Sequence, residues 1–335
     1  MKAFAILVLV FVVSLSASSG FPTVKELSSH LFTNAPIVWQ LQTNHLPKQF
    51  WIYQRHLPRI FSATVITNAI VLGSLQSKGY PQPSTNQTCI VAEPPNPCCN
   101  VCNFFIDPSE ASMEYLSPNY KNGSPSGLPS NEDIIERAWE CVPQLGLDPA
   151  HMIQKSFFEH SFNADQTEVG STNFICGRGV FLSRLLDGFS FFSPDNQGTD
   201  AEGLSLELGS YGEIRYYCFR WSALERYEQQ QTANFKEIGE CIKAHKAIVL
   251  ASPDEVDYFA RLRTLAKAKK LTITEITAVY CDWVFGTIPT SGVPCKFAIP
   301  IAELKAIADF GTSNTTVRLI SPILSSEVKR LMQSK

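Results

Sequence analysis

The spacing of apolar residues predicts four helices along the chain. In residues 60–78, apolar positions recur on one broad side, as in a helix or a helix that passes into a strand. A second helical period, at residues 130–146, opens on the capping-box pattern Ser-x-x-Asp. Two further periods follow at residues 235–245 and 252–266, and the second of them also begins with a capping box.

Apolar runs bounded by turn residues predict the strands. These runs lie after the second helix and again after the fourth, so the order helix-then-strands occurs twice. This order favours an α+β fold, with helices packed on antiparallel sheets, over a doubly wound parallel sheet. The predicted strands are 152–158, 179–192, 204–208, 213–221, 271–280, 296–301 and 317–323.

This pattern divides the chain into five parts. We expect an N-terminal helical and extended region at residues 21–79, a first α+β unit at 131–232 and a second α+β unit at 233–335. Residues 80–130 contain nine prolines and four cysteines, which predicts a long loop. Residues 1–20 have the character of a targeting segment.

The loop at residues 80–130 has little apolar core, so we expect disulfides to hold it together. One pair of its cysteines forms a C-x-x-C, which leaves a redox pair or a metal site as alternatives. Zinc would need a second cysteine or histidine pair at defined spacing, and none follows. A redox motif would open a helix after a buried strand, which this segment does not. The four cysteines are Cys89, Cys98, Cys99 and Cys102.

Six further cysteines are spread over the two predicted units. Cys281 and Cys295 flank a turn-rich segment, so we expect them to pair first. The other four fall on predicted helical faces or in strands, and their connectivity stays open, as does the alternative of a free catalytic thiol. These four are Cys141, Cys176, Cys218 and Cys241.

The N-terminus predicts export. A short basic start precedes an apolar run at residues 3–15, and small residues follow at 16–20. The run is shorter than a bilayer span, so we expect a cleaved signal peptide, not a membrane anchor, and no later transmembrane segment. The protein is therefore expected to be secreted. In a eukaryotic host three sequons would accept glycans, at Asn86, Asn122 and Asn314.

Composition and charge narrow the class of partner. Hydrophobic residues make up 44% of the chain and charged residues 18%, so a folded protein is expected. The 28 basic and 31 acidic residues balance to a formal charge of −3 without a basic stripe, which argues against nucleic-acid binding. We expect the partner to be another protein or a peptide. The sequence does not predict an oligomeric state.

The strand-rich part of the chain resembles a known group of secreted domains. Residues 180–192 carry an arginine and an Asp-Gly-hydrophobic turn, residues 212–217 a Gly-acidic-hydrophobic hairpin, and Trp221 follows. These patterns are similar to PepSY and thermolysin-propeptide domains, including the YycI-like regulators. A degenerate repeat ends at residues 297–301 and 317–320, so the resemblance covers about residues 130–325. It implies one or two cystatin-like α+β units in tandem that bind or inhibit a partner.

The search for catalytic residues yields one candidate pair, Glu159 and His160. These neighbours belong to the densest titratable group in a chain with only six histidines. On a strand they would face opposite sides, and a partly buried structural histidine is the competing interpretation. No H-E-x-x-H, nucleophile elbow or complete dinucleotide motif is present, and we predict no metal and no cofactor.

Two functional hypotheses follow. The leading one is a secreted, disulfide-stabilised binding or inhibitory protein built on PepSY-like units. The alternative is a secreted enzyme of unfamiliar type, with Glu159 and His160 lining a pocket.

Overall fold

The computed structural model describes residues 31–32, 34–41, 46–73, 104–117, 126–163, 173–193, 201–250, 258–281 and 296–333. Within these ranges the chain forms fourteen strands and five α-helices. The strands assemble into two seven-stranded sheets.

The first sheet is antiparallel throughout. Its strand order is β3-β4-β9-β8-β6-β5, and the short β7 pairs with the end of β6. Its strands are β3 (Phe104–Asp107), β4 (Ser112–Leu116), β5 (Met152–Asn163), β6 (Asn173–Leu186), β7 (Phe189–Ser190), β8 (Gly203–Leu208) and β9 (Ile214–Arg220).

The second sheet combines the N-terminal strands with the C-terminal ones. Its main path is β1-β12-β13-β14-β11, in which only β1 and β12 are parallel. A ribbon of β2 and β10 joins it through two residue pairs between β2 and β13. Its strands are β1 (Ile37–Trp39), β2 (Gln49–His56), β10 (Ala223–Gln231), β11 (Ile248–Val249), β12 (Lys270–Cys281), β13 (Phe297–Asp309) and β14 (Asn314–Pro322).

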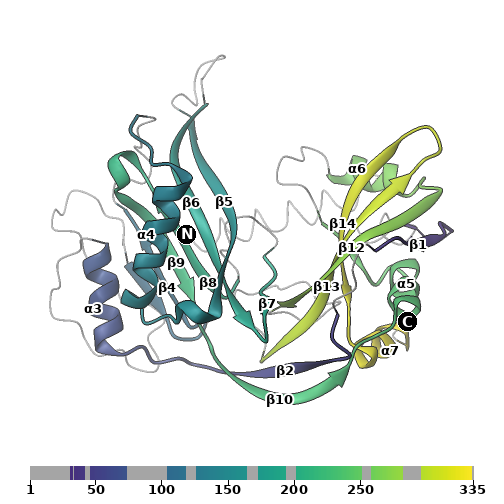
Figure 1. The fold of residues 1–335 in the computed structure, drawn as a ribbon, viewed down its shortest axis with the longest axis horizontal. Coiled ribbons are helices and arrows are strands. Elements are labelled where there is room, and N and C mark those ends of the chain that lie inside the picture. Colours follow the sequence, from purple (N-terminus) through teal and green to yellow (C-terminus); the bar gives the residue numbers. More distant parts are fainter. Residues whose placement is uncertain are drawn as a thin grey trace, which may run out of the picture.

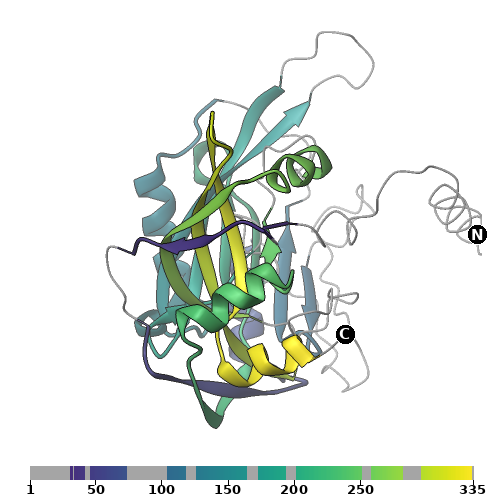
Figure 2. The same ribbon diagram turned by 90° about the vertical axis from the view of Figure 1, so that its right-hand side faces the viewer.

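The helices lie on the outer sides of the two sheets (Figure 1). Helices α3 (Ala63–Leu72) and α4 (Asn131–Gln144) pack on the first sheet, while α5 (Phe235–Lys243), α6 (Tyr258–Leu265) and α7 (Ser325–Gln333) belong to the second. The sheets form an open half-barrel, and the β2–β10 ribbon runs along one end of both. Figure 2 shows the second sheet with α5 and α7 across its outer side.

Of the four apolar clusters in the described ranges, three hold this arrangement. One lies between the first sheet and helices α3 and α4, and another lies between the second sheet and its helices. A third cluster joins the sheets, where Phe181 of β6 and Phe191 meet Tyr53 of β2 and Tyr280 of β12. Phe191 also forms an isolated parallel bridge with Tyr280. The two sheets therefore share one buried contact region.

Several predicted elements are confirmed. The first helix forms as α3, and α4 begins with the predicted capping box, in which Ser130 accepts from the Asp133 amide and Asp133 from the Ser130 amide. The predicted runs at 204–208 and 213–221 form β8 and β9. Helix α5 has a capping box of its own, made by Asn234 and Glu237.

The α+β prediction with cystatin-like units in tandem is wrong, because the described residues are predominantly strand. Strands β5, β6, β12 and β13 are 12 to 14 residues long, so they extend beyond the apolar runs that predicted them. Strands from the N-terminal region complete the second sheet, and β10 leaves the first sheet to pair with β2. The result is a half-barrel of two large sheets.

The expectation of a disulfide-rich loop at residues 80–130 also needs correction. Its described part contains the β3–β4 hairpin, which pairs with β9 and becomes the edge of the first sheet. Phe104, Ile106 and Met113 are buried in its core. Alternating apolar residues thus form strands here despite the many prolines. The loop cysteines, Cys89, Cys98, Cys99 and Cys102, lie outside the described residues.

Candidate functional site

The structure separates the two catalytic candidates. Glu159 and His160 are neighbours on β5, so their side chains leave opposite faces of the first sheet. Glu159 of β5 accepts a hydrogen bond from Nε of Arg178 on β6 at 3.1 Å, and the two side chains form an exposed ion pair. Glu159 therefore serves as the partner of Arg178 and does not orient His160.

His160 lies instead beside a buried ion pair. It stands opposite Gly177 of β6, and the Glu207 carboxylate lies directly over this glycine, because a Cβ there would come within 2.1 Å of Glu207 Oε1. Glu207 is 3.7 Å from Arg215 Nε, and both side chains are 1% exposed. Burial and the charge of Arg215 lower the pKa of His160, so its imidazole is neutral at pH 7.

Glycines make room for this cluster. A Cβ at Gly209 would come within 2.3 Å of Arg215 Cδ, as one at Gly177 would meet Glu207. The Arg215 guanidinium also donates to the carbonyl of Cys176. A neutral imidazole beside a buried Glu–Arg pair is a chemically plausible acid–base group. The sign of this cluster in the sequence is the small residue Gly177 on the neighbouring strand β6. Its role can be recognised only when the pairing of β5 with β6 is known.

A second buried charge cluster joins the two sheets. Glu202 contacts Arg55 of β2 and Arg184 of β6, each at 3.1 Å, and its side chain is fully buried. Ser222 contributes its amide to Glu202 at 2.9 Å and its hydroxyl as acceptor for Arg55 at 2.7 Å. Burial raises the pKa of Glu202, but Arg184, Arg55 and the hydrogen bonds with Ser222 together outweigh burial, so the pKa lies below its usual value.

Three of the features that carried the PepSY resemblance, namely Arg184, the Asp187-Gly188 turn and Trp221, lie at this junction. Arg184, besides contacting Glu202, lies over the Trp221 ring at 4.3 Å. Asp187 and Gly188 have left-handed φ angles of 50° and 85° and form the tight turn between β6 and β7. The Asp187 carboxylate accepts from Tyr53 Oη of the ribbon at 2.7 Å. These residues thus connect the first sheet to the β2–β10 ribbon.

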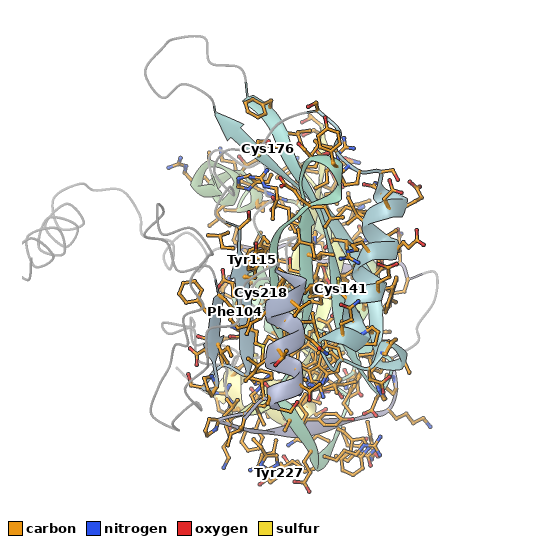
Figure 3. All side chains as sticks on the ribbon, turned by 90° about the vertical axis from the view of Figure 1, so that its left-hand side faces the viewer. Phe104, Tyr115, Cys141, Cys176, Cys218 and Tyr227 are labelled. Carbon is orange, nitrogen blue, oxygen red and sulfur yellow. The ribbon has the colours of Figure 1, made fainter. Side chains whose placement is uncertain are left out.

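The face of the first sheet that points away from α3 and α4 carries a row of side chains, which we call the inner-face row. It is defined by directly paired residues on β3, β4, β9, β8 and β6: Phe105, Glu114, Cys218, Ser205 and Phe181. Their sequence neighbours face the core under α3 and α4. Phe104, Tyr115 and Cys218 show the position of these strands in Figure 3. Sequence reasoning missed this row because β3 and β4 were assigned to a loop.

The cysteines that the structure describes differ from the disulfide prediction. Cys141, Cys176, Cys218 and Cys241 are free thiols, and no disulfide joins any of these four. Burial raises the pKa of Cys141 and Cys241 to about 11 and that of Cys218 to about 12, so these three thiols stay protonated near neutral pH. Cys281 is buried, and its expected partner, Cys295, lies outside the described residues.

One predicted glycan acceptor can be placed. Asn314 and Thr316 are exposed at the start of β14, next to the turn that follows β13. Asn86 and Asn122 lie outside the described residues, as do residues 1–20.

The described residues contain no group of three or more His, Cys, Asp or Glu side chains arranged to hold a metal ion. A bilayer span would need a longer and more apolar helix than any that the structure describes.

No family model matches the chain, and no curated protein matches it. Among solved structures, an uncharacterized protein from Eubacterium rectale ATCC 33656 is similar over 85% of this chain and 86% of its own, with 9% identity and a TM-score of 0.39. This likeness is too weak to carry an argument about fold or function.

Proposed function

We propose that the protein is a non-catalytic binding protein that recognises another protein or a peptide. The observation that carries the proposal is a surface at the β2–β10 ribbon, which we call the ribbon patch. It consists of two contacting groups of side chains along the ribbon, Trp51 with Arg226 and Tyr227 with Phe297 and Lys296. Tyr227 is 55% exposed and lies at the end of the molecule in Figure 3.

The composition of the ribbon patch is that of a binding hot spot. Tryptophan, tyrosine and arginine are the residues that contribute most often to the binding energy of protein interfaces. Tyr227 occupies a β-bulge between Arg226 and Glu228, and bulges frequently redirect a side chain toward a functional surface. Tyr227 packs on Phe297 with ring centroids 5.1 Å apart.

The ribbon patch is also held in place before any partner binds. Arg226 donates to Asp187 at 2.7 Å and lies over the Trp51 ring at 5.3 Å, while its side chain remains 57% exposed. Lys296 Nζ lies 5.4 Å from the centroid of Phe297. A side chain that is already ordered loses less conformational entropy on binding, which favours affinity.

The alternative, an enzyme, now depends on different residues. Glu159 is committed to Arg178, so an acid–base role would fall to His160 beside Glu207 and Arg215. Both carboxylate and guanidinium of that pair are buried and packed against glycines, which also fits a structural role. The binding proposal is preferred because the ribbon patch is exposed and already ordered.

Export and the PepSY-like character of residues 130–325 remain predictions that accompany this proposal. A mature N-terminus near residue 21, read by mass spectrometry of the secreted protein, would support export. The free thiols of Cys141, Cys176, Cys218 and Cys241 mean that disulfides at these positions are no part of the proposal.

Site-specific photocrosslinking tests the proposed surface. A photoreactive phenylalanine analogue at position 227 should give a discrete adduct with one partner in the native host. The same analogue at Ile307, which is 37% exposed on the second sheet, is the matched control and should give none. Identical adducts from both positions, or none from position 227, would contradict the proposal.

A further inference from the structure

Arg59, between β2 and α3, is a half-buried cation without an acidic partner. It donates from Nη1 to the Trp221 carbonyl and lies over the Phe61 ring at 4.8 Å, but no described carboxylate forms an ion pair with it. Burial lowers the pKa of Arg59, Glu202 raises it, and the charge of Arg184 lowers it again. A partly buried charge without a counter-ion costs stability. An anion that binds beside Arg59 would remove this cost.

Arg184 brings a second guanidinium to the same place. Its Nη1 donates to the Ser222 carbonyl at 2.7 Å, and its guanidinium lies over the Trp221 ring at 4.3 Å. Arg59 and Arg184 thus contact one tryptophan, the first through its carbonyl and the second through its ring. The Glu202 carboxylate lies 3.1 Å from Arg184 and compensates its charge. Of the two cations, Arg59 is therefore the one that lacks a negative charge.

Both guanidiniums keep N–H groups that solvent reaches. In each of them Nη1 makes the hydrogen bonds described above, and Nε and Nη2 make none with any described residue. These nitrogens do not belong to the buried polar atoms without a partner, so each of them is in contact with solvent. Trp221 is itself only half-buried. A ligand can therefore reach free donors of Arg59 and Arg184 from solvent.

We propose that Arg59 and Arg184 form a binding site for a carboxylate group beside Trp221. The N–H groups of a guanidinium form a planar fork that matches the two oxygens of a carboxylate. One carboxylate supplies the single negative charge that Arg59 lacks, and its carbon chain covers the accessible part of Trp221. The carboxylate belongs to a small organic acid or to the C-terminus of a polypeptide. This site is separate from the ribbon patch and does not depend on it.

Ligand-observed NMR titration tests the assignment with defined probes. We expect butanoate to bind about tenfold more tightly than its neutral analogue n-butanol, since only the anion accepts charge-assisted hydrogen bonds. Inorganic phosphate should bind more weakly than butanoate, because it has no carbon atoms to cover Trp221. Equal binding of butanoate and n-butanol, or tighter binding of phosphate than of butanoate, overturns the proposal.

Variants of Arg59 place the binding at this residue. Arg59→Gln should weaken binding of butanoate about tenfold, and Arg59→Lys, which keeps the charge but loses the planar fork, should weaken it a few-fold. Arg137→Gln is the matched control, because Arg137 is an exposed arginine of α4 that is paired with Glu140 at 2.8 Å, and its loss should not change binding. Wild-type affinity of Arg59→Gln for butanoate overturns the proposal.

A further probe separates the two sources of the carboxylate. Binding of acetyl-alanyl-leucine with an affinity at or above that of butanoate, and its loss on amidation of the C-terminus, assigns the site to polypeptide C-termini. Binding of butanoate alone assigns it to small organic acids.

Thermal melting gives a second readout and shows whether each variant folds. At about ten times its Kd, butanoate should raise the Tm of the wild-type protein by about 1 to 3 °C, because it binds the folded state. The same concentration should raise the Tm of Arg59→Gln by less than about 1 °C. Equal shifts in the two proteins would show that butanoate binds elsewhere, which overturns the proposal.

Discussion

Two carboxylates in or next to the first sheet, Glu202 and Glu114, lie in different electrostatic surroundings. Glu202 is fully buried but lies between Arg55 and Arg184, so its pKa is lowered and the charge is retained. Glu114 is only half-buried, but it forms no ion pair with any described residue, and burial and the charge of Glu110 raise its pKa. Burial alone therefore does not decide the state of a carboxylate, and the neighbouring charges do. Glu202 is therefore expected to serve the stability of the fold.

Removing Glu202 should be costly. Glu202→Ala leaves Arg55 and Arg184 buried without their shared partner, so the free energy of unfolding should fall by about 3 to 5 kcal/mol. Urea denaturation measures this directly. The control, Glu275→Ala, breaks an exposed pair with Lys305 and should cost less than about 1 kcal/mol. Equal losses in the two variants would show that the Glu202 cluster is not a structural centre.

Two glycines should respond to alanine in opposite directions. Gly177→Ala places a Cβ against the buried Glu207 carboxylate, so unfolding free energy should fall by about 1 to 3 kcal/mol. Gly239→Ala lies within α5, where the nearest atom would be 3.9 Å from the new Cβ, and should stabilise by about 0.5 to 1 kcal/mol. Chemical denaturation of the pair checks both signs. A stabilising Gly177→Ala would contradict the placement of Glu207.

His160 should make the fold sensitive to acid. Burial and the charge of Arg215 hold its folded pKa below the usual histidine value of 6.5, so the unfolded chain binds the proton more readily as pH falls. The contribution of the neutral imidazole is present above pH 6.5 and is lost as pH falls toward the folded pKa. In His160→Gln, the decline of unfolding free energy from about pH 7.5 to 5 should therefore be shallower than in the wild type. Equal slopes of unfolding free energy against pH in the two proteins would show that His160 does not lie in the buried surroundings described above.

At the scale of elements, short connections hold the half-barrel together. The turn at Asp187 ends the β6–β7 hairpin and brings a carboxylate to the β2–β10 ribbon, where Tyr53 and Arg226 donate to it. The ribbon pairs with the second sheet through Phe297 and Ala298 of β13, and the Tyr280 hydroxyl of β12 donates to the Trp51 carbonyl. Contacts to both sheets therefore position the ribbon and its patch.

Asp187→Asn tests this connection while preserving the turn, because asparagine also tolerates the left-handed conformation. Loss of the ion pair with Arg226 should lower unfolding free energy by about 1 kcal/mol. Amide hydrogen exchange should accelerate in β7 and β10 but not in the β13–β14 hairpin. Unchanged exchange in β10 would show that the ribbon is held by other contacts.

The elements also show what a sequence can predict. The capping box at Ser130 is a local signal, and the helix that it was expected to begin is present in the structure. The box expected at residues 252–255 lies outside the described residues, and the one at Asn234 was not predicted. β10 gave no strand signal because most of its residues are polar and exposed, so it lacks apolar alternation. Its pairing with β2, some 170 residues away, depends on tertiary contacts. The α+β prediction failed here, because β1 and β2 of the N-terminal region complete the second sheet, which the C-terminal strands form.

The candidate site was harder to predict than the fold. Glu159 and His160 are adjacent in sequence but face different surroundings, whereas His160 and Glu207 come together only through the register of β5, β6 and β8. The inner-face row depends in the same way on β4 lying beside β9. Cross-strand register is a property of the assembled sheet, so these groupings are absent from any local pattern.

At the scale of the whole molecule, two sheets share one buried junction and expose a binding surface at one end. The apolar cluster around Phe181 and Tyr280 and the charge cluster around Glu202 lie between the sheets. The ribbon patch extends from this junction, so its side chains are supported by both sheets. A rigid support for exposed tyrosine and arginine is the physical basis of the proposed function.

The affinity of the crosslinked partner for wild-type protein and for Tyr227→Ala, measured by isothermal titration calorimetry, tests this claim most directly. Loss of the exposed ring should weaken binding at least tenfold, or about 1.4 kcal/mol, as expected for a hot-spot residue. Ile307→Ala, on the second sheet, should bind as the wild type does. A Tyr227→Ala variant that binds its partner with wild-type affinity would contradict the proposed function.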